Sequence, residues 1–246
     1  MGPERQIVWS VVIPAFNEAQ RLPASLREVV AFFDGRDEPY EIIVVDDGSR
    51  DATCERVREV QASHPEVRLI AIPENRGKGY AVRAGMVNAR GVFRLFTDAD
   101  GATPIVELKR LEPALRAGAD LVIGSRALED PQVSIQARQH RVRAGRVFNW
   151  LVGRLGLRGV ADSQCGFKCF RAPVAEDLFR SLTTDGFGFD VELLLLAQRR
   201  GYRIVEVAVN WADQPGSKVS VLADGPRMMW QILLARVAVA RGRHEQ

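Results

Sequence analysis

The sequence predicts an α/β fold, in which a mostly parallel sheet carries helices on both of its faces. The chain has 246 residues, 46% of them hydrophobic, which suits one large domain with a substantial core. Short β-rich runs alternate with helical patterns through its first half, and this alternation is typical of parallel sheets. Polar residues follow the ends of several runs, at the edge where such sheets bind ligands.

Each expected strand is a short run rich in apolar residues. In chain order the runs are residues 7–13, 41–45, 68–72, 93–97, 120–124, 167–170 and 204–209. Several of them are apolar without alternation, which indicates strands that are buried on both faces.

Helical patterns fill the stretches between these runs. The first helix has Pro23 in its first turn, and the second begins at Ser49 or Asp51, either of which is a good N-cap. Later helices are expected at residues 79–90, 104–117, 134–157, 173–181, 190–200 and 222–240. No internal repeat or linker divides the chain, so residues 1–246 are expected to form a single domain.

The distribution of charge says more than the total. A net charge of +3 is too small to indicate a nucleic-acid-binding protein. Residues 131–161 contain no Asp or Glu, yet they hold Arg138, Arg141, Arg143, Arg146, Arg154 and Arg158. This stretch is either a solvated helix face or a surface for phosphates and anionic lipid headgroups.

The cysteines and the N-terminus indicate a cytoplasmic protein that is soluble or peripheral to a membrane. Cys54, Cys165 and Cys169 are an odd number without zinc-ligand spacing, so we expect free thiols in a reducing compartment. The N-terminal residues lack the apolar core of a signal peptide. No apolar stretch approaches the roughly 20 residues that a spanning helix needs.

Two acidic pairs follow predicted strands that end at the same edge of the sheet. Asp46 and Asp47 follow one strand, and Asp98 and Asp100 follow another. Carboxylates gathered in this way repel one another unless a metal ion or a basic side chain lies between them. Carboxylate oxygens suit Mg²⁺ or Mn²⁺, and the spacing favours a metal site over a helix cap paired with a surface arginine.

A glycine-rich basic loop, residues 75–79 (NRGKG), lies between a strand and a helix. Its glycines let the backbone approach a ligand, and its two cations and the helix N-terminus after it favour a phosphate. The spacing of a P-loop is absent.

Taken in order, VVIPAFNEAQRL, IIVVDDGSRDAT, ENRGKGYAVRAG, TDADGATP and VIGSR resemble glycosyltransferase family two, which has the GT-A fold. Further along, ADSQCGFKCFR, FGFDVELL and VNWADQPGSKVS resemble its dolichyl-phosphate β-glucosyltransferase branch, and the mannose synthases less closely. The resemblance covers residues 7–240. It implies a nucleotide-sugar-binding half, about 7–130, and an acceptor-binding, membrane-facing half, about 131–246.

The resemblance also implies roles for individual residues. The implied donor-binding residues are Pro14, Ala15, Asn17, Glu18, Asp46, Asp47, Arg76, Gly77, Lys78, Ala99, Ser217 and Lys218. The acceptor-binding residues are Ser125, Arg126, Arg141, Gln164 and Trp211, and the metal ligands are Asp98 and Asp100. Catalysis falls to Asp98, Asp100, Arg126 and Asp190.

Several of these assignments have alternatives. Relatives can place a metal-binding Gln at position 102, where this chain has Ala, so Gln164 is a substitute third ligand. Asp190 is either the N-cap of helix 190–200 or a general base for a hydroxyl acceptor. Trp211 either lines a sugar pocket or packs in the core.

The implied reaction is inverting transfer of a sugar, glucose from UDP-glucose, to a polyprenyl or dolichyl phosphate at an anionic membrane surface. The alternatives are a GDP-mannose enzyme, a transferase acting on a sugar or protein hydroxyl, a nucleotidyltransferase and a non-catalytic binding protein. The apolar stripes of helices 134–157 and 222–240 could contact the membrane, pack on the sheet or form a homodimer interface.

Overall fold

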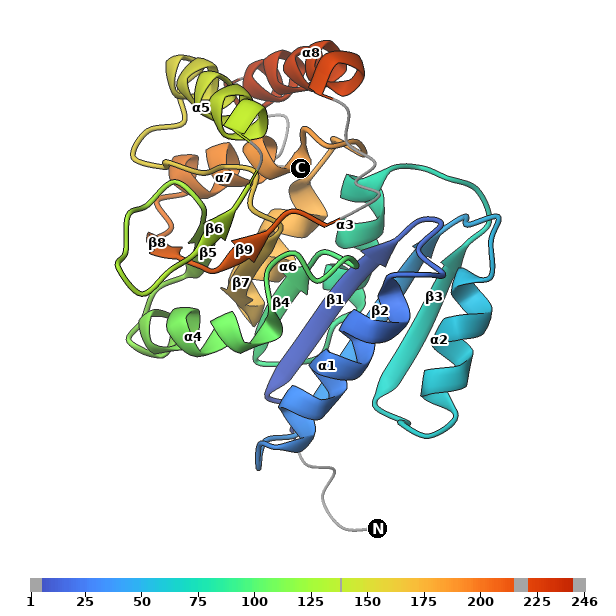
Figure 1. Ribbon diagram of the computed structural model, residues 1–246. Helices are drawn as coiled ribbons and strands as arrows, with labels where there is room; N and C mark the ends of the chain where they lie inside the picture. Colours follow the sequence, from blue (N-terminus) through green and yellow to red (C-terminus); the bar gives the residue numbers. More distant parts are fainter. Residues whose placement is uncertain (1–5, 138, 215–220, 241–246) are drawn as a thin grey trace.

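The computed structural model describes residues 6–137, 139–214 and 221–240, and it contains one central sheet (Figure 1). Its seven strands follow the order β3-β2-β1-β4-β7-β5-β8. The strands are β1 (Trp9–Ala15), β2 (Tyr40–Asp47), β3 (Val67–Ile72), β4 (Phe93–Thr97), β5 (Leu121–Ser125), β7 (Phe167–Arg171) and β8 (Ile204–Ala208). Every neighbouring pair is parallel except that β7 runs antiparallel to β4 and β5. The predicted mostly parallel sheet is therefore confirmed.

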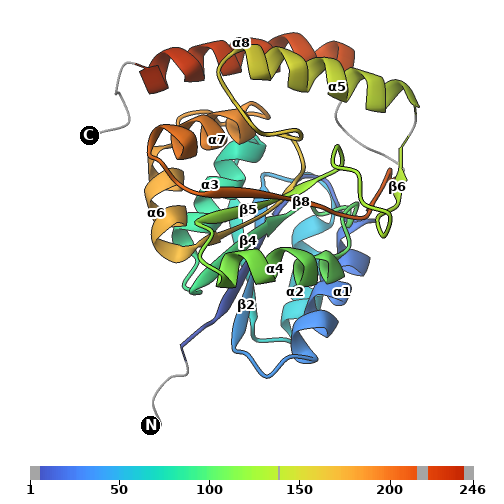
Figure 2. The same cartoon turned by 90° about the vertical axis from the view of Figure 1, so that its left-hand side faces the viewer.

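Helices cover both faces of this sheet. They are α1 (Leu22–Asp34), α2 (Thr53–Gln61), α3 (Lys78–Asn88), the 3-10 turn η1 (Ile105–Glu107), α4 (Leu108–Arg116), α5 (Gln139–Arg154), α6 (Ala172–Ser181), α7 (Phe189–Arg199) and α8 (Val221–Ala240). The helices α1, α2 and α4 pack on one face, and α3, α6 and α7 pack on the other. In Figure 2, α5 and α8 form a further layer outside α7.

The continuous apolar runs of the inner strands have a direct explanation in this two-sided burial. In β1, Val11 and Ile13 belong to the core cluster under α1, whereas Val12 between them belongs to the cluster under α3. Successive side chains of a strand point to opposite faces, so both faces of β1 need apolar residues.

Two predicted helix boundaries are wrong. Residues 135 and 136 of the expected helix 134–157 instead form strand β6 (Ile135–Gln136), which pairs with β9 (Trp211–Ala212). The second helix begins at Thr53 with Ala52 as its cap, because the Ser49 amide donates to the Asp46 carboxylate in a turn. Asp51 still accepts a hydrogen bond from the Thr53 amide, at 3.0 Å.

None of the helices that the structure describes is both long and apolar enough to cross a membrane.

Candidate active site

The carboxyl ends of β1 and β2 and the segments that follow β1, β3 and β4 enclose a cavity of about 350 Å³ at the carboxyl edge of the sheet. We call this space the donor cavity, after the donor-binding role that the sequence motifs imply for its lining. The predicted residues in this lining are Pro14, Ala15, Glu18, Asp47, Gly77, Lys78, Asp98, Ala99 and Asp100. Phe16, Arg21, Asn75, Ala81 and Phe187 also line it, although the sequence analysis gave them no role. Asn17, Asp46 and Arg76 lie outside this lining.

The basic loop is folded over the end of β2 by one carboxylate. Asp47 accepts hydrogen bonds from the backbone amides of Arg76 and Gly77, both at 2.8 Å, and from the Asn75 side chain at 2.9 Å. Gly77 has φ +109°, and a Cβ there would lie 2.5 Å from the Asp185 carbonyl oxygen. Only glycine fits this position. The three hydrogen bonds that Asp47 accepts fix the conformation of the loop.

Basic side chains neutralise the acidic pair at the end of β4. Lys78 Nζ lies 2.6 Å from Asp98 Oδ1, and Arg21 lies 3.6 Å from Asp100 Oδ2. Arg21 also pairs with Glu18 at 2.5 Å. Lys78 and Arg21 thus place basic side chains beside the acidic pair, and Arg21 is one that the sequence analysis missed.

These charges shift the protonation of the site. Burial and the neighbouring charge of Asp98 raise the pKa of Asp100. Burial alone would lower the pKa of Lys78, but the charges of Asp98 and Asp190 hold it above its usual value. Lys78 is therefore a permanent cation beside the acidic pair.

Asp46 is a buried carboxylate whose two oxygens differ in their hydrogen bonding. The residue is 2% exposed, and its Oδ2 accepts the Ser49 amide at 3.0 Å. Its Oδ1 is buried without a hydrogen-bond partner in the described part of the chain. A buried unpaired carboxylate oxygen is costly, so it is suited to accept a hydrogen bond from a ligand.

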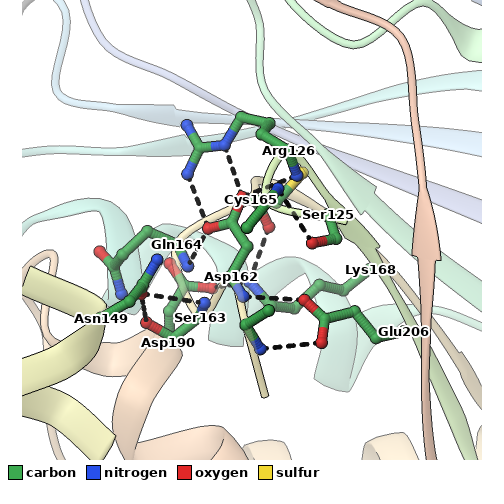
Figure 3. Close-up of polar contacts among 12 residues, drawn as sticks. Ser125, Arg126, Asn149, Asp162, Ser163, Gln164, Cys165, Lys168, Asp190 and Glu206 are labelled. Atoms are coloured by element: carbon green, nitrogen blue, oxygen red, sulfur yellow. Dashed lines mark hydrogen bonds and ion pairs between the residues drawn. The ribbon is translucent and has the colours of Figure 1, made fainter. Parts of the chain in front are cut away.

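Arg126 lines a second, larger space of about 940 Å³, which we call the acceptor cavity after the acceptor-binding role that the sequence motifs imply for Arg126. Its Nε and Nη2 atoms donate to the two Asp162 oxygens at 2.6 and 2.8 Å (Figure 3). Trp211 of β9 lies under the same guanidinium, with Cζ 5.5 Å from the ring centroid. The structure thus brings Arg126 and Trp211 together on one cavity wall, and Trp211 is half-buried there rather than in the core.

Asp162 is a residue of this site that the sequence analysis quoted in a motif without giving it a role. It is 2% exposed and accepts the amides of Arg126 and Gln164 as well as the guanidinium. Glu206 fixes the same turn by accepting the Asp162 amide at 2.8 Å. Although burial opposes ionisation, Arg126 holds the pKa of Asp162 below its usual value.

The remaining predicted acceptor residues have different positions. Ser125 is fully buried, and its hydroxyl accepts a hydrogen bond from the Ala127 amide at 3.2 Å. It therefore stabilises the turn of residues 125–127, in which Arg126 lies. Gln164 has a buried Nε2 without a partner among the described residues. Arg141 lies on α5, but its side chain is outside the described part, as are Ser217 and Lys218 altogether.

Asp190 is not the N-cap of its helix, which corrects one predicted alternative. The helix α7 begins at Phe189 with Gly188 as its cap, so Asp190 lies inside the first turn. Its Oδ1 is 2.5 Å from Nζ of the fully buried Lys168, which also donates to the Cys165 carbonyl at 2.7 Å. Asp190 is absent from the lining of both cavities.

A short segment, Asp162–Gly166, links the two cavities, since Asp162 lines the acceptor cavity and Gly166 contacts Asp98 in the wall of the donor cavity. At one end Asp162 holds Arg126. At the other end a Cβ on Gly166 would lie 2.1 Å from Asp98 Oδ2, so the segment is in direct contact with the acidic pair. Lys168 donates hydrogen bonds to both the Cys165 carbonyl and the Asp190 carboxylate, so the segment is also anchored to helix α7.

The sheet with its acidic carboxyl edge defines a GT-A glycosyltransferase fold. The structure of glucosyl-3-phosphoglycerate synthase from Mycobacterium tuberculosis, in complex with Mn²⁺, UDP and phosphoglyceric acid, matches with a TM-score of 0.67. The two chains are 22% identical, and the match covers 95% of this chain and 78% of the other. At this identity the match shows the shared fold.

Residues 10–179 match the family model described as Glycosyl transferase family 2, and the chain belongs to this family. It is 42% identical over 225 residues to the dolichyl-phosphate β-glucosyltransferase of Drosophila melanogaster, covering 86% of this chain and 69% of the relative. It is 36% identical over 254 residues to the human enzyme of the same name, covering 98% and 78%. The family resemblance seen in the sequence motifs is confirmed.

We expect Asp162→Asn to lower the free energy of unfolding at neutral pH by about 3 kcal/mol, because it removes one partner of a largely buried ion pair. The folded-state pKa of Asp162 is lowered, so the pair stabilises the protein above the unfolded pKa, about 4. This contribution is lost as the pH falls through the folded-state value. Urea unfolding at several pH values measures the difference between variant and wild type, which should shrink in acid.

Asp130→Asn is the matched control, because it breaks the more exposed Arg110–Asp130 pair at 2.7 Å. It should change stability much less. Equal losses in the two variants, or a difference independent of pH, would contradict the role given to Asp162.

Proposed function

We propose that this chain transfers glucose from UDP-glucose to a dolichyl or other polyprenyl phosphate, with inversion at the sugar. The observation that carries the proposal is the segment Asp162–Gly166, which joins an acidic, lysine-bearing cavity to an arginine-bearing one. Such an arrangement suits the meeting of two phosphate-bearing substrates. The relatives named dolichyl-phosphate β-glucosyltransferase support the choice of glucose and of a lipid phosphate.

In this proposal the donor cavity holds the nucleoside diphosphate. Asp46 lies outside the cavity lining but next to its residue Asp47, and its Oδ1, which has no partner among the described residues, would accept a hydrogen bond from the base. Asp47 would keep the loop 75–78 closed beside the ribose. Lys78 supplies fixed positive charge for the departing diphosphate. Arg76 precedes the lining residue Gly77 and lies over the Tyr80 ring, with Cζ 3.8 Å from the ring centroid, and it would add a second cation for the diphosphate.

Asp98 and Asp100 fit a divalent cation. They offer carboxylate oxygens on one wall of the donor cavity, and Mg²⁺ or Mn²⁺ commonly takes one or two carboxylates together with substrate phosphates. No group of three acidic, histidine or cysteine ligands occurs in the described residues, so diphosphate oxygens and water would complete the coordination. The bound ion would neutralise charge on the leaving diphosphate. The solved relative with Mn²⁺ and UDP supports this choice.

The acceptor phosphate is already an anion near neutral pH, so its attack on the sugar requires no general base. Asp162 holds two of the three guanidinium nitrogens of Arg126, and Nη1, which does not bond to Asp162, would bind the acceptor phosphate in the acceptor cavity. Arg141 on α5 would add a second cation. A hydroxyl acceptor would need a base, and the first candidate, Asp190, is buried against Lys168.

An anionic membrane surface is the proposed location of the acceptor. The outer helices α5 and α8 expose large apolar side chains, namely Val147, Trp150, Leu151, Trp230, Leu233, Leu234 and Val237. Cations accompany them, since Arg154 lies over the Trp150 ring and Arg236 is exposed. Apolar residues mixed with arginine are typical of helices that bind reversibly to lipid headgroups. The alternative occupant of this face is a second copy of the chain.

The direct test offers the protein a panel of nucleotide sugars together with short polyprenyl phosphates. We expect a lipid-linked product from UDP-glucose, detected by mass spectrometry, and little from GDP-mannose. Transfer to a sugar hydroxyl without transfer to lipid phosphate would replace the proposed acceptor.

Asp98→Asn and Asp100→Asn should each reduce turnover at least about 100-fold, because each removes charge that holds the cation at the leaving group. Circular dichroism should stay unchanged. The wild-type enzyme should lose activity in chelator and regain it with Mn²⁺ or Mg²⁺. Asp120→Asn, at the amino end of β5, is the control and should retain activity. Full activity in excess chelator would remove the metal from the proposal.

Arg126→Lys should lower kcat/KM for the lipid phosphate by about tenfold and leave UDP affinity unchanged. Lysine keeps the charge but loses the forked contact, and a hydrogen bond to a charged group contributes about 1.5–3 kcal/mol. Arg141→Ala should act in the same direction. Arg116→Lys, which alters the Arg116–Glu112 pair outside the linings of both cavities, is the control. A collapse of UDP affinity in Arg126→Lys would move that arginine to the donor site.

Trp230→Ser combined with Leu234→Ser should weaken binding to anionic vesicles at least about tenfold, because fully burying one such side chain contributes roughly 1.5–3 kcal/mol and a factor of ten requires about 1.4 kcal/mol. Co-sedimentation measures the binding, which should also weaken with salt. Val106→Ser, on an exposed residue of η1, is the control. Wild-type protein that stays in the supernatant at low salt would exclude the proposed surface.

A further inference from the structure

The loop between α6 and α7, residues 183–188, lies between the donor cavity and the outer helix α8. Phe187 of this loop lines the donor cavity, although it follows β4 by some ninety residues. Glu192 of α7 anchors the start of the loop, because its carboxylate accepts the Thr183 and Thr184 amides at 3.0 and 2.8 Å. The position of Phe187 therefore depends on what holds the rest of the loop.

On its inner side the loop packs directly on the basic loop, residues 75–79, at the start of α3. The Tyr80 amide donates to the Asp185 carbonyl at 3.1 Å, and Arg83 pairs with the Asp185 carboxylate at 2.7 Å. A Cβ on Gly79 would lie 2.5 Å from the Thr184 carbonyl oxygen. With backbone against backbone and no side chain between them, one loop cannot shift without displacing the other.

On its outer side the loop is held by Gln231 of α8. The Gln231 Oε1 accepts the Gly188 amide at 3.2 Å. A Cβ on Gly186 would lie 2.5 Å from Gln231 Nε2, and one on Gly188 would lie 2.9 Å from Gln231 Cβ. The glycines that flank Phe187 thus provide the room for a glutamine to reach the loop.

We propose that Gln231 is a positioning residue for the donor cavity. Through Gly186 and Gly188 it holds Phe187 in the cavity wall and presses the loop 183–188 against the start of α3. The inference rests on the proposed function in one respect, since it takes this cavity as the site of the nucleoside diphosphate. Gln231 itself does not line the cavity, so it acts on the ligand only through the loop.

Gln231→Ala should weaken UDP binding about five- to tenfold, measured by titration calorimetry with Mn²⁺ present, and raise KM for the nucleotide sugar. The KM for the lipid phosphate should not change. Gln198→Ala is the matched control, because Gln198 of α7 accepts the Arg158 amide at 3.2 Å and likewise ties a helix to a loop. The two variants should have similar melting temperatures, but Gln198→Ala should bind UDP as the wild type does.

Two further variants separate positioning from general destabilisation. Gln231→Glu keeps an oxygen for the Gly188 amide and should retain most of the UDP affinity. Gly186→Ala should weaken UDP binding in the wild-type background, where its Cβ meets the Gln231 amide, and have less effect beside Gln231→Ala.

The outcomes that overturn the inference are distinct from those that overturn the proposed function. If the wild type binds UDP and Gln231→Ala binds it equally well, Gln231 has no positioning role. If Gln231→Ala and Gln198→Ala weaken UDP binding to the same extent, the effect is one of stability, and the inference again fails. If the wild type does not bind UDP at all, the donor-cavity assignment is wrong and the inference falls with it.

Discussion

Charges that are partly or wholly removed from water must be paired, and this requirement organises the carboxyl edge of the sheet. Four acidic side chains in or beside the two cavities each have a counter-charge from a different element of the fold. The pairs are Lys78–Asp98, Arg21–Asp100, Arg126–Asp162 and Lys168–Asp190. Because each pair joins two elements, the same contacts that satisfy the electrostatics also fix the shape of the two cavities. Removing one partner would leave the other uncompensated at the very edge where substrates meet.

The antiparallel strand β7 brings the acidic pair and Arg126 to neighbouring positions on the carboxyl edge of the sheet. It lies between β4, which leads to the acidic pair, and β5, which leads to Arg126. The segment that enters β7 therefore has to cross from one cavity to the other, and Asp162 and Gly166 are its two points of contact. Lys168, inside the strand, secures that crossing to α7. The distance between the proposed donor and acceptor sites is in this way set by the sheet.

Much of the fold and part of the site could be predicted from local pattern. The apolar run of β1 predicts a strand buried on both faces, and Asp98 and Asp100 follow a strand visibly in the sequence. Partners distant along the chain could not be predicted in the same way. The sequence offers Asp162 as one polar residue among several, and only folding brings its carboxylate to Arg126. Asp190 is a residue type that favours the N-cap position. In the structure it lies inside the first turn of α7, where its carboxylate accepts a hydrogen bond from Lys168, 22 residues earlier in the chain.

The order of strands also bears on whether the two halves of the chain can be separated. The donor loops belong to the first part of the chain, yet a strand from the second part fills the gap between β4 and β5. A fragment ending near residue 130 would leave β4 without its neighbour β7 and β5 without either of its neighbours, β7 and β8. Unpaired strand edges promote aggregation. The two halves that we propose for donor and acceptor, about 7–130 and 131–246, are therefore interlocked within one sheet and do not form separable modules.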